Sequence, residues 1–207
     1  MNHADTGRPT SDLAVNVVIA DPPNPPNNPY VSAFPNLAAM YLSAAVKQRI
    51  PQATVTYLDH RLSRAAHLQR VRELQPDVYG LSYTSPFARI AARFLTEVRA
   101  AAPHALIVCG GAHPTIAAED ILATTPADCC CIGEGEVTFP ELIQAWMNED
   151  DFAAVPGLAI RNGSGTVVYT ERRQAVRPLD DLPRPDYRLA NLASYSGLRM
   201  AMNQPST

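Results

Sequence analysis

Short apolar runs alternate with segments of helical periodicity along most of this chain, and this alternation constrains the fold more than any other feature. The runs are too short for helices and continuously apolar, so each predicts a buried parallel strand. Successive strand–helix units place helices on both faces of one sheet. We therefore predict a flavodoxin-like, doubly wound α/β domain with a five-stranded parallel sheet. The five predicted strands are Val15–Ala20, Thr54–Leu58, Val78–Ser82, Ala105–Cys109 and Ala127–Ile132.

The segments between these runs carry helix-start signals. Asn36 is the predicted N-cap of a helix from Leu37 to about Arg49. Ser85 is the predicted N-cap of another helix, with Pro86 at its first position and an apolar stripe after it. Further helices are predicted over Leu62–Leu74, from Thr115 to about Ala123, and from Val137 to about Met147.

The regions outside the predicted sheet have a different character. Residues 1–14 are expected to form a disordered lead-in, and the α/β domain is predicted to span residues 15–150. In residues 151–207, two short runs around the turn Asn162–Gly165 predict a small β-hairpin. The proline-rich and charged segment from Arg172 onward has no periodicity, so we interpret it as a linker or docking arm after which nothing folds.

Composition limits the classes of function. The chain has 207 residues, of which 46% are hydrophobic and 18% charged, and this profile is that of a globular protein. Its net charge of −3 argues against a nucleic-acid partner, because phosphate binding needs clustered positive charge. No apolar run is long enough to cross a membrane, and the N-terminus lacks a secretory signal. We therefore expect a cytoplasmic protein with no membrane partner.

All four cysteines, Cys109 and Cys129 to Cys131, fall inside predicted buried strands. Adjacent residues of a strand point to opposite faces of the sheet, so the triplet cannot present three sulfurs to one metal ion. We interpret these residues as small apolar fillers and predict no metal site.

Four loops follow the predicted strands and should meet at one edge of the sheet. The carboxyl ends of parallel strands are where such folds bind ligands. The first loop is the proline-rich Asp21–Pro29. The second, Ser82–Ser85, carries small hydroxyls, and the glycine loops Gly110–Thr115 and Gly133–Glu136 follow the fourth and fifth strands. The candidate binding residues are Ser82, Tyr83, Thr84, Ser85, Gly110, Gly111, His113, Pro114, Gly133, Glu134 and Gly135.

Common ligands of this fold class are excluded by the loop after the first strand. Asp21–Pro29 contains no glycine, so the G-x-G-x-x-G fingerprint of dinucleotide sites is absent, as is a P-loop anywhere in the chain. A phospho-receiver would need an aspartate after the third strand and a lysine after the fifth, and neither is present. The glycine loops instead suit a large, flat or extended uncharged ligand, or its nucleotide tail. The alternative that the glycines only form tight turns stays open.

Taken together, the segments PDVYGLSYTS, IVCGGAHPT and CIGEGEVTFPELI resemble the N-terminal cobalamin-binding domain of cobalamin-dependent radical S-adenosylmethionine enzymes. That family includes methyltransferases and an anaerobic magnesium-porphyrin ester cyclase. The resemblance covers roughly Val15 to Tyr195. It implies that the chain binds cobalamin and serves a radical S-adenosylmethionine protein or domain.

The chain departs from that family in two respects. It ends at Thr207 without the C-x-x-x-C-x-x-C motif of the radical barrel, so we expect no iron–sulfur cluster and no radical chemistry from this chain alone. Whether it is a stand-alone subunit, a truncation or an excised domain stays open. The loop after the first strand also lacks the histidine of the D-x-H-x-x-G motif, which implies base-off cobalamin without a protein histidine ligand. His60 is interpreted as a surface-loop residue, and His113 as a contact or helix cap.

Glu134 and Glu136 are spaced for the start of a helix, where carboxylates favour the helix dipole, and we do not interpret them as catalytic acids. Three hypotheses follow: a cobalamin-binding module, a cofactor-free scaffold derived from one, or an enzyme acting on a different small ligand. For the first we expect valine at Gly111 or Gly135 to abolish corrinoid retention while the fold persists.

Overall fold

A computed structural model describes residues 14–24, 34–174, 178–192 and 195. Within these residues the chain forms one seven-stranded sheet in the order β2-β1-β3-β4-β5-β6-β7. The strands are β1 (Asn16–Ala20), β2 (Thr54–Leu58), β3 (Val78–Ser82), β4 (Leu106–Gly110), β5 (Cys129–Cys131), β6 (Leu158–Arg161) and β7 (Val167–Tyr169).

Strands β1 to β5 pair in parallel, which confirms the predicted fold class. From β1 the chain crosses to β2 on one side of it and then returns to β3 on the other. Connections of opposite direction leave a crevice at the carboxyl ends of the two flanking strands, where ligands of open α/β sheets bind. The ligand site is therefore expected between β1 and β3.

The predicted hairpin forms, and its strands extend the main sheet. β6 runs antiparallel to β5 with Leu158 opposite Cys131, and β7 runs antiparallel to β6. Pairing with β6 covers the edge that β5 would otherwise expose. The division of the chain at residue 150 stays a prediction.

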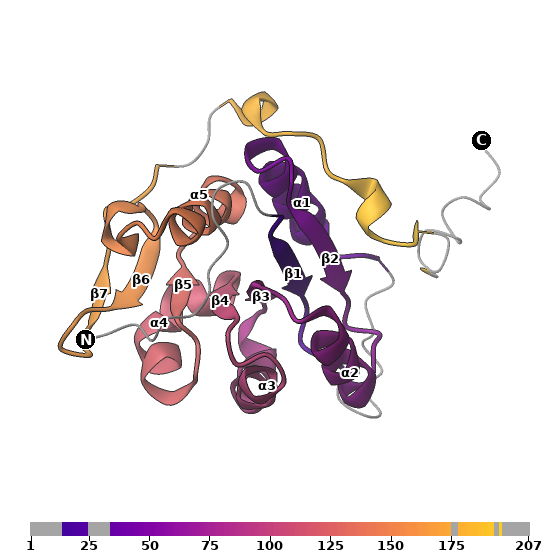
Figure 1. Ribbon diagram of the computed structural model, residues 1–207, viewed down its shortest axis with the longest axis horizontal. Helices are drawn as coiled ribbons and strands as arrows, with labels where there is room; N and C mark the ends of the chain where they lie inside the picture. The colour runs from indigo at the N-terminus through magenta and orange to yellow at the C-terminus, as the bar shows by residue number, and fades with distance from the viewer. Residues whose placement is uncertain (1–13, 25–33, 175–177, 193–194, 196–207) are drawn as a thin grey trace.

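Five helices cover the sheet within the described residues. They are α1 (Leu37–Arg49), α2 (Arg64–Leu74), α3 (Ala88–Ala101), α4 (Ala112–Thr124) and α5 (Gly135–Asn148). Helices α1 and α5 lie on one face, and α2, α3 and α4 on the other (Figure 1). None of the described helices is both long and apolar enough to cross a membrane.

Alternation along the strands divides the apolar residues between two cores. In β1, Val17 and Ile19 pack toward α1 and α5, whereas Val18 and Ala20 belong to the opposite core. The same alternation places Cys129 and Cys131 on one face and Cys109 and Cys130 on the other. All four cysteines are buried free thiols, and no group of metal ligands occurs among the described residues. The interpretation as fillers is confirmed for their packing.

Among the predicted helices, only α1 starts at the predicted residue. Helix α2 begins two residues after the predicted Leu62, and α5 begins two residues before the predicted Val137. Ser85 is not the N-cap, since a 3₁₀ helix over Ser85–Phe87 begins after Thr84 and leads into α3. Helix α4 begins at Ala112, three residues before the predicted start. Pro114 is compatible with this start because the N–H groups of a first helical turn have no intrahelical acceptor.

The described part of the segment after Arg172 lies against the domain, and the expectation that nothing folds after this arm falls on residues outside the described ones. Residues 178–192 contain 3₁₀ helices over Leu179–Asp181 and Tyr187–Leu189. They pass across α1 toward β2 (yellow in Figure 1). Tyr195, which follows them in the chain, is buried. The predicted lead-in at residues 1–13 and most of the proline-rich loop, residues 25–33, lie outside the described residues.

Candidate functional site

The loops after β3 and β4 are locked together by backbone hydrogen bonds. The Tyr83 amide donates to the Gly110 carbonyl (3.0 Å), and the His113 amide donates to the Tyr83 carbonyl (3.2 Å). The His113 ring lies 5.6 Å from the Tyr83 ring, and its Nδ1 is 3.1 Å from Ser85 Oγ. The segments Ser82–Ser85 and Gly110–Pro114 therefore form one rigid rim at the carboxyl edge of the sheet.

The backbone conformation of this rim requires a glycine at position 111. Its φ of 94° lies in the region that side chains rarely adopt, and a Cβ there would be 2.9 Å from the Tyr83 carbonyl oxygen. Gly110 differs, because a Cβ built there meets nothing within 4 Å. Valine at Gly111 would thus distort the loop directly, so a loss of corrinoid binding in that variant would not be specific to a contact with the ligand. Valine at Gly110 is the better test of ligand contact.

Thr115 joins the two glycine loops. Its hydroxyl donates to the Gly111 carbonyl (2.9 Å) and accepts a hydrogen bond from the Gly133 amide (3.0 Å). The sequence marked Thr115 only as the start of a helix, and no local pattern indicates this second role. The bridge fixes the spacing between the loops after β4 and β5.

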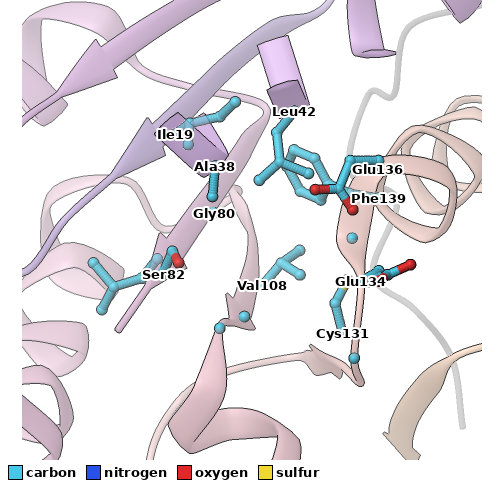
Figure 2. Close-up of a pocket in the computed structure, with 15 residues that line it drawn as sticks. Ile19, Ala38, Leu42, Gly80, Ser82, Val108, Cys131, Glu134, Glu136 and Phe139 are labelled. Atoms are coloured by element: carbon cyan, nitrogen blue, oxygen red, sulfur yellow. The ribbon is translucent and has the colours of Figure 1, made fainter. Parts of the chain in front are cut away.

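A cavity of about 260 Å³ opens between these loops and the helices α1 and α5, beside the crevice between β1 and β3 (Figure 2). Apolar side chains from both helices and three strands form most of its wall. Its lining residues are Ile19, Ala38, Leu42, Gly80, Leu81, Ser82, Val108, Gly110, Gly111, Cys131, Gly133, Glu134, Gly135, Glu136 and Phe139.

Two carboxylates, those of Glu134 and Glu136, belong to the cavity wall at the start of α5 (Figure 2). Glu134 occupies the N-cap position without a side-chain capping bond, and Glu136 lies in the first helical turn, where a negative charge favours the dipole. None of the described residues that line the cavity is basic. The cavity is therefore unsuited to a nucleoside di- or triphosphate and suited to an apolar ring.

A larger hollow of about 510 Å³ lies next to the cavity, and the two share Ser82 and Gly111 as lining residues. Its wall combines aromatic and apolar side chains with a carboxylate after β1, an imidazole after β2 and hydroxyl groups at the end of β3. Its lining residues are Asp21, Pro22, Asn24, Phe34, Pro35, Asn36, Leu37, His60, Ser82, Tyr83, Thr84, Phe87, Gly111 and Ala112.

Asp21 organises the polar side of the hollow. Its buried carboxylate accepts hydrogen bonds from Asn36 Nδ2 (2.6 Å) and the Tyr57 hydroxyl, and His60 Nδ1 lies 3.4 Å away. Burial, and then the adjacent Asp21 charge, raises the pKa of Tyr57. The interpretation of His60 as a surface-loop residue was wrong, since its side chain is only 13% exposed and contributes to the wall.

The structure brings most of the predicted site residues to these two spaces. Ser82, Gly110, Gly111, Gly133, Glu134 and Gly135 line the cavity, and Ser82, Tyr83, Thr84 and Gly111 line the hollow. Ser85, His113 and Pro114 line neither, although Ser85 and His113 belong to the rim. For all of the predicted site residues, the role of ligand contact stays a prediction.

The sequence did not indicate that residues of α1 and α5 line the cavity. Leu42 and Phe139 look like ordinary core residues of amphipathic helices, so no sequence signal distinguishes them from the rest of the core. Asp21 and Asn36 were named only as a loop start and a helix cap. Their contact across 15 residues could be found only in the fold.

Comparisons with known proteins agree with this geometry. A family model described as the B12 binding domain matches residues 29–143. The anaerobic magnesium-protoporphyrin IX monomethyl ester cyclase of Cereibacter sphaeroides is 29% identical over 182 residues, which cover 82% of this chain and 29% of the cyclase. The cobalamin-dependent radical SAM methyltransferase TokK of Streptomyces tokunonensis is 34% identical over 115 residues, which cover 54% of this chain and 17% of TokK.

Solved structures show the same fold. The cobalamin-dependent S-adenosylmethionine radical enzyme OxsB, with aqua-cobalamin and S-adenosylmethionine bound, superposes with a TM-score of 0.76 at 21% identity, covering 91% of this chain and 26% of OxsB. The radical S-adenosylmethionine methyltransferase TsrM from Kitasatospora setae, with cobalamin and a [4Fe-4S] cluster bound, gives a TM-score of 0.63 at 20% identity, covering 77% of this chain and 31% of TsrM.

The chain thus spans about a third or less of each of these relatives. The matched region, residues 29–143, contains α1 to α4, most of α5 and the glycine loops that line the cavity. By this match and by its fold, the chain belongs to the B12-binding domain family.

Proposed function

We propose that this chain is a cobalamin-binding module. The observation that carries the proposal is the apolar cavity that adjoins a larger hollow at the carboxyl edge of the sheet, in a chain of the B12-binding family. A corrinoid combines a broad macrocycle with a narrow nucleotide tail, and two adjacent spaces of unequal size suit such a shape. The open space in front of Gly110 supports the same interpretation, since any side chain there would occupy the cavity.

Different residues among those described would provide the apolar and the polar contacts with such a ligand. Ile19, Leu42 and Phe139 offer an apolar wall to an aromatic ring, whose burial contributes roughly 25 cal/mol per Å². Ser82 and Thr84 present hydroxyls in the hollow, and the Asp21 carboxylate accepts hydrogen bonds there. Bound cobalamin would supply a cobalt centre able to carry a methyl group or exchange electrons.

We further propose that cobalamin is held base-off and without a protein histidine on cobalt. The two histidines near the site support this, because both rings already have partners. His60 lies against Asp21, and His113 lies against Tyr83 and Ser85. The visible spectrum of the bound corrinoid should therefore lack the features of base or histidine coordination and should be the same in His60→Ala and His113→Ala. A spectral change in either variant would assign that histidine to cobalt.

The direct test is retention of hydroxocobalamin. The purified chain, mixed with a small excess of hydroxocobalamin at micromolar concentration, should elute from gel filtration with about one corrinoid per chain. Cobinamide, which lacks the nucleotide tail, should be retained less well because it leaves the cavity empty. If no corrinoid elutes with the protein, the cofactor-free scaffold becomes the better hypothesis.

The partner is proposed to be a radical S-adenosylmethionine protein or domain, as in the relatives, in which the matched segment is a small part of the chain. The iron–sulfur cluster would then be held by that partner, since all four thiols of this chain are buried and burial raises the pKa of Cys131 to about 12. Iron and sulfide analysis of the anaerobically reconstituted chain should find no stoichiometric cluster. A [4Fe-4S] absorption band in this chain would overturn that part of the proposal.

A further inference from the structure

Tyr195, far along the chain from the sheet, is buried beside the end of β2. Its side chain is among the largest that are fully buried, at 1% exposure. Its hydroxyl donates to Asp59 Oδ2 (2.6 Å), and the Arg61 guanidinium stacks 3.6 Å above its ring. Burial, and then the hydrogen bond to Asp59, raises the pKa of Tyr195, so it stays protonated as the donor. We call this set, Tyr195 with Asp59 and Arg61, the latch.

A second anchor holds the segment before the latch. Asp186 accepts hydrogen bonds from Lys47 Nζ (2.6 Å) and Ser43 Oγ (3.0 Å), and its amide donates to the Met40 carbonyl (3.0 Å). Lys47 is the only lysine of the chain. The arm thus has one anchor on α1 and one at the end of β2, with the Arg188–Leu189 peptide bond between them.

The turn that receives Tyr195 also forms part of the hollow. Asp59 and Arg61 contact Tyr195, while His60 between them lines the hollow next to Asp21. The turn is tight, since Asp59 Oδ1 accepts from the Arg61 amide (2.8 Å). The His60 carbonyl also accepts from the Asn24 amide (3.2 Å), which ties the turn to the loop after β1. Asp59 and the wall residues His60 and Asn24 are therefore connected through one hydrogen-bonded turn.

We propose that Tyr195 is a positioning residue of the ligand site, and that closing of the latch and occupancy of the hollow favour one another. This inference rests on the proposed cobalamin binding, and it assigns to the arm a role in forming the site. With Tyr195 in place, the Asp59–Arg61 turn is held and His60 and Asn24 keep their positions. A ligand that contacts this wall stabilises the latched state, and by linkage the latched state binds the ligand more tightly by the same factor.

The test uses the full chain, hydroxocobalamin and trypsin. Trypsin cleaves after Arg188 but not at Arg184, which precedes proline, so the Arg188–Leu189 bond reports opening of the arm. Saturating hydroxocobalamin should slow this cleavage about fivefold, the factor that corresponds to one hydrogen bond. Tyr195→Phe should weaken hydroxocobalamin binding by a similar factor and remove most of the protection. Tyr187→Phe is the matched control, because Tyr187 lies on the same arm and is 55% exposed.

The outcomes separate the two proposals. If wild type retains hydroxocobalamin but Arg188 cleavage is unchanged by it, or if Tyr195→Phe binds as tightly as Tyr187→Phe, the coupling is overturned and cobalamin binding stands. If wild type retains no corrinoid, the proposed function fails and the coupling fails with it. Circular dichroism of Tyr195→Phe should match wild type, so that weaker binding is not loss of the fold.

Discussion

The side-chain amide of Asn36 donates a 2.6 Å hydrogen bond to the buried carboxylate of Asp21 while its own oxygen caps α1 by accepting from the Ala38 amide. One side chain thus joins the end of β1 to the start of α1. Both residues line the hollow. The geometry of the proposed binding site and the stability of the first strand–helix connection therefore depend on the same contact.

Asn36→Ala should lower the free energy of unfolding by about 1–3 kcal/mol, because it removes both the cap and the donor to a buried carboxylate. Asn36→Asp keeps a capping oxygen but places a second carboxylate against Asp21. Compared with wild type at the same pH, it should be destabilised at pH 7 by repulsion between the two carboxylates, and this difference should shrink toward pH 4, where the pair can share a proton. Urea unfolding at both pH values measures the effect.

Ser63→Ala is the control for this series, because Ser63 only caps α2 through its bond from the Ala66 amide (3.2 Å). It should lower the free energy of unfolding by about 1 kcal/mol, as the loss of an ordinary N-cap does. Equal losses in Asn36→Ala and Ser63→Ala would show that the contact with Asp21 contributes nothing to stability.

Gly110→Val should block corrinoid binding without harming the fold. Gly110 lines the cavity, and a Cβ there meets no atom within 4 Å, so the valine side chain occupies space reserved for the ligand. We expect at least about tenfold weaker hydroxocobalamin binding, equivalent to roughly 1.4 kcal/mol, with a near-native unfolding midpoint. Gly163→Val, at an equally open position in the hairpin turn, should bind normally. Tight binding by Gly110→Val would place the ligand elsewhere.

His67 makes stability depend on pH. It is fully buried between α2 and β3, with Nε2 2.8 Å from the Tyr79 hydroxyl and its ring edge-on to Phe94. Burial lowers its pKa from 6.5 to about 4. The folded protein therefore keeps His67 neutral where the unfolded chain takes up a proton, so its stabilising effect is complete above pH 6.5 and is lost as the pH falls toward 4.

From pH 7 to pH 5 this group should cost about 2 kcal/mol of unfolding free energy. His67→Gln, which cannot titrate in this range, should show a shallower pH dependence even if it is less stable at pH 7. Urea unfolding of both proteins from pH 7.5 to 4.5 gives the comparison. Parallel profiles would mean that His67 is protonated in the folded state or that its site opens easily.

Arg99 forms hydrogen bonds at the amino ends of β4 and β5, which lie at the opposite end of the strands from the ligand site. Its guanidinium donates to the carbonyls of Ala105 (2.6 Å) and Pro126 (3.1 Å) and to Asp128 Oδ2 (2.6 Å), which also accepts from the Ile107 amide (2.7 Å). Arg99→Leu should lower the free energy of unfolding by about 1–3 kcal/mol, because it removes the charged donor from two carbonyls and leaves the Asp128 carboxylate with the Ile107 amide.

Arg99→Leu should still bind hydroxocobalamin with native affinity, since it touches the amino ends of β4 and β5. Arg93→Leu on the same helix is exposed and should change stability by no more than about 0.5 kcal/mol. Chemical unfolding and a binding titration test both variants. A loss of corrinoid affinity in Arg99→Leu at full folding would contradict the separation of the two edges.

The sequence by itself determined the strand–helix order, because periodicity is local: runs such as Val78–Ser82 and the helix Leu37–Arg49 appear with their predicted bounds. It also placed the glycine loops at one edge, since parallel strands share a direction. The motifs around Gly110–Pro114 and Gly133–Glu136 were enough to indicate the family that the comparisons found.

Only the tertiary structure determines which residues line the site. Leu42 and Phe139 become cavity residues only because α1 and α5 pack side by side over β1 and β3, and His60 reaches Asp21 only because β2 lies beside β1. Tyr195 docks on Asp59 across 136 residues. Contacts between residues this distant leave no periodic pattern in one sequence, because they depend on the packing of whole elements. That packing places Tyr195 against the turn that borders the proposed binding site.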